Sequence, residues 1–375
     1  MLIGEKCGTL LHVGSAEETY RQTQLVTYLG NKRKLLSFIG QGVAEVQRRL
    51  GRKQLRCYDA FAGSGVVSRY LKSVAAELFS NDLEDYAAVL GKCYLANRSE
   101  IPPLEELHAD LLRTIETTWA PGMIAELYAP QDDAHIRPGE RAFYTRRNAI
   151  YLDTARRAIQ ALPEQLRPFF LAPLLYEASV HTNTGGVFKG FYKNAKGIGQ
   201  FGGRGKQALS RITADISLPL PCFSQHECAY EVLQGDATTV ARTLPELDLA
   251  YLDPPYNQHP YGSNYFMLNL IATYERPGKI SAVSGIPEDW NRSGYNTRHT
   301  VQAALSELLA ALPCRFALMS YNSEGLLSVE EITSLAAPDW MVQTLEQSYP
   351  SYKAGRNLRA RAQHVREYLF IFERK

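Results

Sequence analysis

Residues 249–256 read Leu-Ala-Tyr-Leu-Asp-Pro-Pro-Tyr, an apolar run that ends abruptly in Asp253-Pro254-Pro255-Tyr256. The run has the length and composition of a buried strand, and the two prolines prevent its continuation. Ligands of open α/β sheets bind beyond the carboxyl ends of the strands, so we expect the acid and the aromatic ring to face a crevice. A simple strand-terminating turn is the alternative, since Asp-Pro and Pro-Pro are common turn dipeptides.

The chemistry of this strand end suits an amino group. Pro255 has no amide N–H to compete for the Pro254 carbonyl, which therefore forms a pair of acceptors with the Asp253 carboxylate. Such a pair matches an exocyclic NH2 group with its two hydrogens, and Tyr256 is placed to stack on the attached base. This is the geometry that an amino methyltransferase needs.

A second motif predicts a ligand site at another strand end. Leu55–Phe61 is a short apolar segment, followed by Ala62-Gly63-Ser64-Gly65 and a helix-like stretch, Val66–Val74. A strand, a glycine turn and a helix start bring backbone close to a ligand. Ser68 stands where the third glycine of the dinucleotide fingerprint would fall, which argues against a nicotinamide cofactor.

The next predicted strand, Glu77–Ser80, leads to Asn81-Asp82, 17 residues beyond Gly65. This is near the distance at which an acid can hold a ribose diol. A tight turn without a ligand is the alternative for the glycine pair alone.

The motifs together resemble the Dam-type, DPPY-motif class of adenine-specific DNA methyltransferases. They occur in the order Tyr28-Leu29-Gly30-Asn31-Lys32, Asp59-Ala60-Phe61-Ala62-Gly63-Ser64-Gly65, Asn81-Asp82, Gly235-Asp236 and Asp253-Pro254-Pro255-Tyr256. The ordered set spans most of the chain and is more specific than any single member. Asn31 departs from the pattern, because many relatives have a second glycine there, whereas Lys32 matches.

The resemblance implies a cofactor, a substrate and a role for each matched residue. It implies that Tyr28–Lys32 closes over S-adenosylmethionine, that Asp82 binds the cofactor's ribose, and that the Asp-Pro-Pro-Tyr motif holds the target adenine. The implied catalytic residues are Asp253, Pro254 and Tyr256. The implied cofactor-binding residues are Tyr28, Lys32, Asp59, Phe61, Gly63, Gly65, Asp82, Asp236 and Asp253. Asp236 lines the site of the cofactor adenine or, alternatively, caps the following helix.

The mechanism expected for such an enzyme requires no metal. The target base must leave the duplex stack before its amino group can receive a methyl group. Asp253 and Pro254 would then accept hydrogen bonds from that amino group, and a fixed carboxylate would stabilise the positive charge that develops on nitrogen. The alternatives are methylation of cytosine, RNA or a protein glutamine amide, and a catalytically silent DNA-binding subunit.

Strand and helix patterns alternate along the chain, which predicts a mostly parallel α/β sheet with helices on both faces. Helical patterns include Lys34–Leu50, Asp85–Asn97 and Thr300–Leu312. Seven strands is the number in the Rossmann-like methyltransferase fold, and the last two suit its antiparallel edge. The strand candidates are Leu55–Phe61, Glu77–Ser80, Tyr230–Leu233, Leu247–Leu252, Phe316–Tyr321, Val342–Tyr349 and Tyr368–Phe372. We expect a catalytic domain of residues 1–97 and 229–375, interrupted by a target-recognition region of residues 98–228.

The interrupting region is expected to be mostly helical, with helices at Arg137–Ala161 and Leu166–Val180. No acidic residue occurs from Ala178 to Ala214, whereas basic and aromatic residues are frequent. Such a loop is suited to contact DNA phosphates and unstacked bases. The residues expected to contact DNA are Lys189, Lys193, Lys196, Arg204 and Lys206, with Arg211 adding charge and Phe188, Phe191, Tyr192 and Phe201 adding rings. The alternative is a glycine-rich surface loop that is merely basic.

Two further segments have open roles. A second basic run either contacts DNA phosphates or forms a solvated face. It comprises Lys353, Arg356, Arg359, Arg361 and Arg366. Residues Arg276–Arg298 read as a loop that either covers the site when DNA binds or only connects two elements.

Composition is consistent with a globular enzyme. The 375 residues are 45% hydrophobic, and a net charge of +2 means that any nucleic-acid site must come from local clustering. The six cysteines form no Cys-x-x-Cys pair, and the spacing of Cys222, His226 and Cys228 is not that of a zinc site. No bilayer-spanning stretch or secretion signal is visible, so a cytoplasmic location is expected. The expected partners are double-stranded DNA, bound by a monomer, and a cognate restriction endonuclease acting on the same site.

Overall fold

The computed structural model describes residues 16–203, 205–350 and 364–375. A seven-stranded sheet has the order β3-β2-β1-β4-β5-β7-β6. The strands are β1 (Leu55–Asp59), β2 (Ala75–Asp82), β3 (Ala229–Gln234), β4 (Leu247–Leu252), β5 (Cys314–Asn322), β6 (Trp340–Pro350) and β7 (His364–Arg374). The first five are parallel, and β7 runs antiparallel between β5 and β6. The predicted seven-stranded α/β fold with an antiparallel edge is confirmed.

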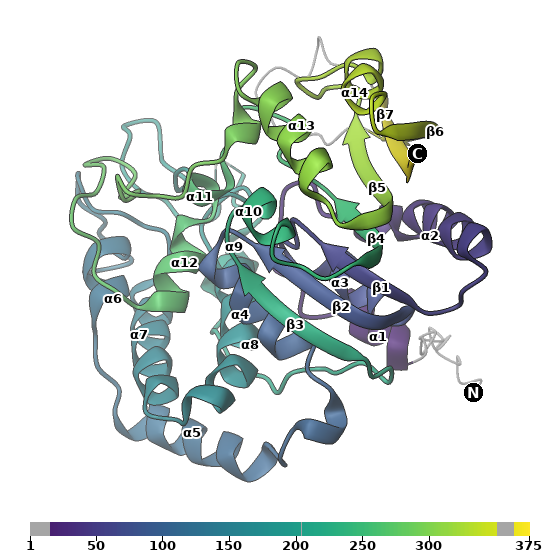
Figure 1. The fold of residues 1–375 in the computed structure, drawn as a ribbon. Helices are drawn as coiled ribbons and strands as arrows, with labels where there is room; N and C mark the ends of the chain where they lie inside the picture. The colour runs from purple at the N-terminus through teal and green to yellow at the C-terminus, as the bar shows by residue number, and fades with distance from the viewer. Residues whose placement is uncertain (1–15, 204, 351–363) are drawn as a thin grey trace, which may run out of the picture.

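Side-chain alternation along the strands produces two buried faces. Cys57 and Leu249 belong to one apolar cluster, and their neighbours Tyr58 and Ala250 belong to another on the opposite face. The helices α2 (Leu36–Leu50) and α3 (Val66–Leu71) cover the first face. The helices α10 (Ala237–Ala241), α13 (Val301–Ala311) and α14 (Val329–Ala336) cover the second (Figure 1).

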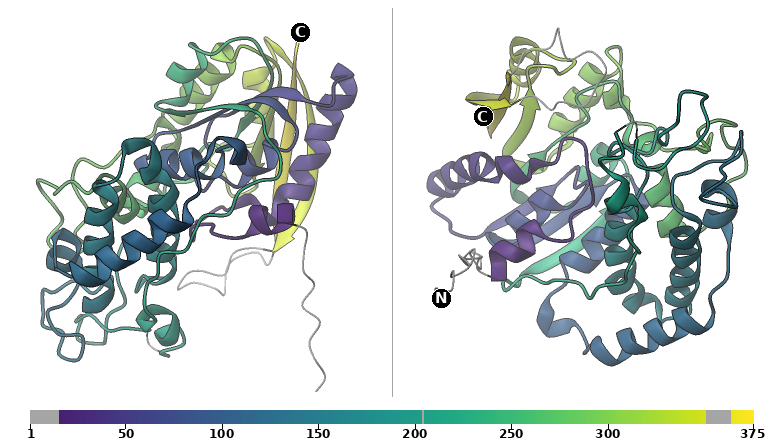
Figure 2. Two further views of the ribbon diagram at one scale, coloured as in Figure 1. Left: turned by 90° about the horizontal axis from the view of Figure 1, so that it is seen from below. Right: turned by 180° about the vertical axis from the view of Figure 1, so that it is seen from behind.

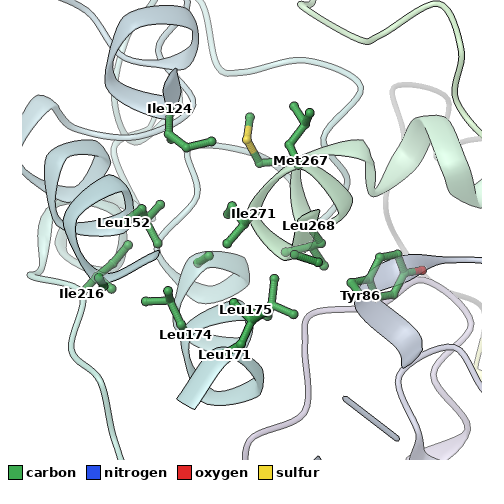
Figure 3. Close-up of a cluster of buried hydrophobic side chains, with 14 of the residues drawn as sticks. Tyr86, Ile124, Leu152, Leu171, Leu174, Leu175, Ile216, Met267, Leu268 and Ile271 are labelled. Atoms are coloured by element: carbon green, nitrogen blue, oxygen red, sulfur yellow. The ribbon is translucent and has the colours of Figure 1, made fainter. Parts of the chain in front are cut away.

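A separate group of helices lies beside the β3 edge of the sheet, as Figures 1 and 2 show. It comprises α5 (Glu105–Thr117), α6 (Met123–Tyr128), α7 (Arg146–Gln160), α8 (Arg167–Val180) and the short α9 (Leu209–Thr213). These helices share one apolar core with α4 (Asp85–Tyr94) and α12 (Phe266–Thr273), to which Leu152, Leu174 and Ile271 contribute (Figure 3). Segments before and after the predicted recognition region therefore help to build its core.

One predicted helix starts in the wrong place. The structure begins α7 at Arg146 rather than at Arg137, because Gly139 adopts a left-handed φ of 91° and Thr145 caps the helix by accepting from the Asn148 N–H. The remaining short elements are α1 (Ala16–Gln22), α11 (Tyr261–Asn264), η1 (Lys32–Leu35), η2 (Arg98–Glu100), η3 (Glu164–Leu166) and η4 (Gly294–Asn296). No helix in the described ranges is long and apolar enough to cross a bilayer.

Candidate active site

A cavity lies at the carboxyl ends of β1, β2 and β4, where the strand order reverses between β1 and β4. Its empty volume is about 1050 Å³ including the open mouth. Most of the residues expected to bind the cofactor line it: Tyr28, Lys32, Phe61, Gly63, Asp82, Asp236 and Asp253. Asp59 and Gly65 do not line it. Asp59 is fully buried beneath the turn, where it accepts from the Ser68 hydroxyl at 2.6 Å and where burial raises its pKa to about 7.

The glycine turn after β1 positions Asp82 at the end of β2. The Gly63 N–H donates to Asp82 Oδ2 at 2.7 Å, and the Glu84 N–H donates to Asp82 Oδ1 at 3.0 Å. These bonds fix the carboxylate against the cavity wall, although burial raises its pKa above the ordinary value. An acid held in this way can accept hydrogen bonds from vicinal hydroxyls.

Tyr28 packs in a cluster with two other tyrosines, whose own rings also stack with centroids 5.9 Å apart. Its ring stacks on Tyr265, with centroids 4.6 Å apart, and on Tyr261 at 5.1 Å. Its hydroxyl lies 3.1 Å from that of Tyr86. The Tyr265 hydroxyl also accepts from the Leu29 N–H at 2.6 Å, so residues 28 and 29 are fixed to the segment that follows Tyr256. Sequence reasoning missed Tyr261 and Tyr265, whose four-residue spacing just after the Asp-Pro-Pro-Tyr motif was the available signal.

Asp253 does not stand alone at the end of β4. Its Oδ2 lies 2.8 Å from Lys32 Nζ, which also donates to the Gly30 carbonyl at 3.0 Å. The exposed fractions of the two side chains are 20% for Asp253 and 7% for Lys32. Burial tends to lower the pKa of Lys32, but Asp253 raises it above its ordinary value, so the ammonium stays charged beside the carboxylate. Sequence reasoning placed Lys32 only in the cofactor segment.

A second cavity lies against the other side of Lys32. Its empty volume is about 2140 Å³ including open solvent, and Lys32, Tyr256, Asn322 and Glu367 are among its lining residues. Tyr256 is half-buried, its ring packs edge-on against Tyr321 at 6.2 Å, and its carbonyl accepts from the Leu326 N–H at 2.9 Å. Pro254 is buried. Lys32 thus lines both cavities, whereas its partner Asp253 lines only the first.

Asp236 has the capping role that was one of its two predicted alternatives. Its Oδ1 accepts from the N–H groups of Thr238 and Thr239 at 3.1 and 3.0 Å, which begins α10. The same residue lines the first cavity, so capping also fixes it in the wall.

The end of the Arg276–Arg298 loop forms part of the wall of the first cavity. Residues 291–296 line it. Asn291 donates to Glu84 Oε2 and to the Leu83 carbonyl, both at 3.2 Å, and Asn269 donates to the same carboxyl oxygen at 2.5 Å. Burial raises the pKa of Glu84 to about 7. This network ties the loop to the segment just after Asp82.

The basic loop exposes Lys189, Lys193, Lys196 and Lys206, whereas Arg204 lies outside the described residues. The expectation for three of its aromatic rings is wrong. Phe188, Phe191 and Phe201 are buried in the helical core and cannot stack on bases. Arg211 also points inward, donating to the carbonyls of Val180, Thr182 and Thr184.

The second basic run lies mostly beyond what the structure describes. Lys353, Arg356, Arg359 and Arg361 fall outside the described ranges, and Arg366 is exposed and pairs with Glu346 at 3.5 Å. Within those ranges, no group of three or more His, Cys, Asp or Glu side chains is arranged to hold a metal ion.

Comparison with known proteins identifies the family. The model of the D12 class N6 adenine-specific DNA methyltransferases matches residues 28–335, from Tyr28 through the glycine turn, Asp82 and the Asp-Pro-Pro-Tyr motif. The chain belongs to this family. It is thus an adenine-specific DNA methyltransferase, as the motifs predicted.

Curated relatives share nearly the whole chain. The chain is 29% identical over 360 residues to the Type II methyltransferase M.NlaIII of Neisseria lactamica, covering 93% of this chain and 99% of that protein. It is also 29% identical to M.CviAII of Paramecium bursaria Chlorella virus 1, covering 92% and 98%. The modification methylase StsI of Streptococcus sanguinis is 25% identical, and the match covers 93% of this chain but only 52% of StsI. The methyltransferase fold described above is therefore common to the region that these proteins share.

Proposed function

We propose that this adenine-specific DNA methyltransferase takes its methyl group from S-adenosylmethionine and transfers it to the exocyclic nitrogen of an adenine flipped out of duplex DNA. The observation that carries this proposal is the Lys32–Asp253 pair: Asp253 lines the first cavity, and Lys32 lines both cavities. The first cavity has an acid and a glycine turn suited to a nucleoside, and the second is open and contains Tyr256. A carboxylate in the wall of the first cavity, paired with a lysine that reaches the second, would lie close to both donor and acceptor.

The first cavity fits S-adenosylmethionine by the chemistry of its walls. Asp82, held by two backbone N–H groups, would bind the ribose hydroxyls, and Phe61 and Asp236 would face the adenine. A Cβ on Gly63 would lie about 3.0 Å from the Tyr28 ring, so the glycine turn packs closely against this ring. When bound, S-adenosylmethionine supplies a methyl group on a positively charged sulfur.

The second cavity would take the flipped adenine. The amino nitrogen is a poor nucleophile because its lone pair is delocalised into the ring, and it cannot be reached inside the duplex. Asp253 and the Pro254 carbonyl would accept its two hydrogens and direct the lone pair toward the methyl group. Tyr256 would hold the ring by stacking, which contributes about 1–3 kcal/mol per base. Because nitrogen becomes positive as the methyl group arrives, the Asp253 carboxylate stabilises the transition state more than the ground state.

Duplex DNA would bind across the helical region, with Lys189, Lys193, Lys196 and Lys206 meeting phosphates. Their exposure in a segment without acidic residues supports this assignment. Two relatives are named Type II methyltransferases and another a modification methylase, which supports a role in a restriction-modification system beside an endonuclease of the same site. We further propose that the enzyme acts on DNA as a monomer in the cytoplasm.

Transfer of labelled methyl groups from S-adenosylmethionine to duplex DNA, followed by identification of the modified base, tests the proposal. Asp253→Ala should fold, bind DNA and lose about 100- to 1000-fold in turnover, as for loss of one oxyanion-hole donor. Asp339→Ala, which removes an exposed carboxylate just before β6, is the matched control and should keep full turnover. Label on cytosine or RNA, no transfer by wild type, or an Asp253→Ala variant as fast as wild type would each contradict the proposal.

A further inference from the structure

Glu367 on β7 is one of the charged residues that line the second cavity, together with Lys32 and Glu324. In the antiparallel pairing of β5 and β7, Glu367 lies opposite Asn322, which lines the same cavity as Tyr256. The end of this strand pair is held by the Ser323 N–H, which donates to the Arg366 carbonyl at 2.9 Å, and by the Arg366 N–H, which donates to Ser323 Oγ at 3.1 Å. Glu367 lies beyond the residues matched by the family model, and no motif pointed to it.

The charge balance of the site makes this position important. The Lys32 ammonium at 2.8 Å offsets the Asp253 carboxylate, so the pair alone carries no net charge. Methyl transfer would move positive charge from the sulfur in the first cavity to the target nitrogen in the second, and a negative charge that lines only the second cavity would favour that movement. Among the described residues, the titratable groups that interact with Glu367 are Lys32, Asp253, Glu324, Tyr251 and Tyr256.

Glu367 is poised to change its charge near neutral pH. Burial raises its pKa to about 7, Lys32 opposes this rise, Asp253 adds to it, and a hydrogen bond from Asn322 opposes it. In turn, Glu367 is among the groups that raise the pKa values of Lys32 and Tyr256. The carboxyl is therefore electrostatically coupled to the groups proposed to act on the base.

We propose that Glu367 is a positioning residue for methyl transfer: its ionised carboxylate gives the Lys32–Asp253 pair a net negative charge and so favours the cation that forms on the target nitrogen. This inference rests on the proposed function. In the step concerned, a nitrogen–carbon bond forms and the carbon–sulfur bond breaks with its electron pair staying on sulfur. The nitrogen then loses one proton to water and keeps the electron pair of that N–H bond.

The test compares Glu367→Gln with wild type in single-turnover methyl transfer to duplex DNA between pH 5.5 and 9. Glutamine has the shape and the neutral charge of protonated glutamic acid, so the transfer rates of wild type and Glu367→Gln should agree below about pH 6. Above pH 8 the variant should be slower by roughly 3- to 10-fold, because the positive charge moves toward the carboxylate rather than arising beside it. Groups such as Asp59 and Glu84, whose pKa values are also raised to about 7, titrate in both proteins and cancel in the ratio.

Two control variants separate charge from structure. Glu373→Gln removes a carboxylate from the far end of the same strand and should keep the wild-type pH profile. Glu367→Asp keeps the carboxylate and should restore most of the rise in rate with pH. S-adenosylmethionine affinity should change less than the transfer rate in all three variants, because neither Glu367 nor Glu373 lines the first cavity.

The outcomes are distinguishable. A ratio of wild-type to Glu367→Gln rates that does not vary with pH, or an Asp variant that behaves like Gln, would overturn the inference and leave the proposed function intact. A wild-type protein that methylates no adenine would remove the proposed function and this inference with it.

Discussion

The two glycines of the turn after β1 offer a matched pair of substitutions that tests the shape of the cofactor cavity. Both have left-handed backbones, with φ of 53° at Gly63 and 78° at Gly65. A Cβ at Gly65 would meet no atom within 4 Å, whereas a Cβ at Gly63 would lie 3.0–3.1 Å from three atoms of the Tyr28 side chain. The two alanine variants share the backbone strain and differ in the clash.

The expected costs follow from these contacts. Gly65→Ala should destabilise the fold by about 1–2 kcal/mol, the cost of a left-handed residue with a side chain. Gly63→Ala should add roughly 1–3 kcal/mol of overpacking, because Tyr28 stacks on Tyr261 and Tyr265 and its hydroxyl is bonded to that of Tyr86, so it cannot easily yield. It should also weaken S-adenosylmethionine binding by at least roughly tenfold, since a shift worth about 1.4 kcal/mol at the cavity wall has that effect.

Urea unfolding gives the first quantity and calorimetric titration of S-adenosylmethionine gives the second. Replacing Tyr28 by leucine removes the ring, so in that background Gly63→Ala should cost no more than Gly65→Ala. Equal costs for the two alanine variants in the wild-type background, with equal cofactor affinity, would show that Tyr28 does not pack against the turn as described.

Two other predictions concern pH and salt. Burial raises the pKa of Glu84 from 4.5 to about 7 in the folded state, so its protonated form stabilises the folded state below about pH 4.5, and this stability is lost as the pH rises to about 7. Glu84→Gln should remove roughly 3 kcal/mol of this pH dependence from the free energy of unfolding. Parallel curves of unfolding free energy against pH for the two proteins would contradict the burial argument. Alanine at Lys189, Lys193, Lys196 or Lys206 should weaken binding to all DNA sequences and lower the salt slope by about one unit per phosphate contact. Unchanged affinity and salt dependence in the combined variant would place the DNA surface elsewhere.

Local patterns predicted the fold because each strand has its own signature. The β4 run is apolar except at Asp248 and is followed by Asp253 and two prolines, and the structure buries all six of its residues. The start of α7 was misplaced because Glu140–Tyr144 are helix-compatible side chains, although Pro138-Gly139 signals a turn and Thr145 caps the helix. The buried rings of the basic loop show the same limit, since composition did not reveal that Phe188 and Phe191 complete a core built from distant helices.

The site was predicted where it depends on residues at strand ends and missed where it depends on tertiary pairing. Asp82 and Asp253 follow apolar runs, so topology alone brings them to one edge of the sheet. The partners that fix them cannot be inferred from spacing: Lys32 lies more than 200 positions from Asp253, and Asn291 reaches Glu84 from a loop that had no assigned role. Each of these contacts joins segments that meet only after the sheet has formed.

Residues 28–32 explain why the ordered set of motifs was more informative than any single motif. Tyr28 packs against the glycine turn and the tyrosines that follow the Asp-Pro-Pro-Tyr motif, and Lys32 pairs with the acid of that motif. Residues 28–32 therefore line both the first and the second cavity and also contact the Asp253 carboxylate. A glycine turn or an Asp-Pro-Pro-Tyr turn alone can occur in any fold. Here Lys32 must reach Asp253 of the Asp-Pro-Pro-Tyr motif while Tyr28 packs on the glycine turn. The two motifs and residues 28–32 must therefore lie together at one site.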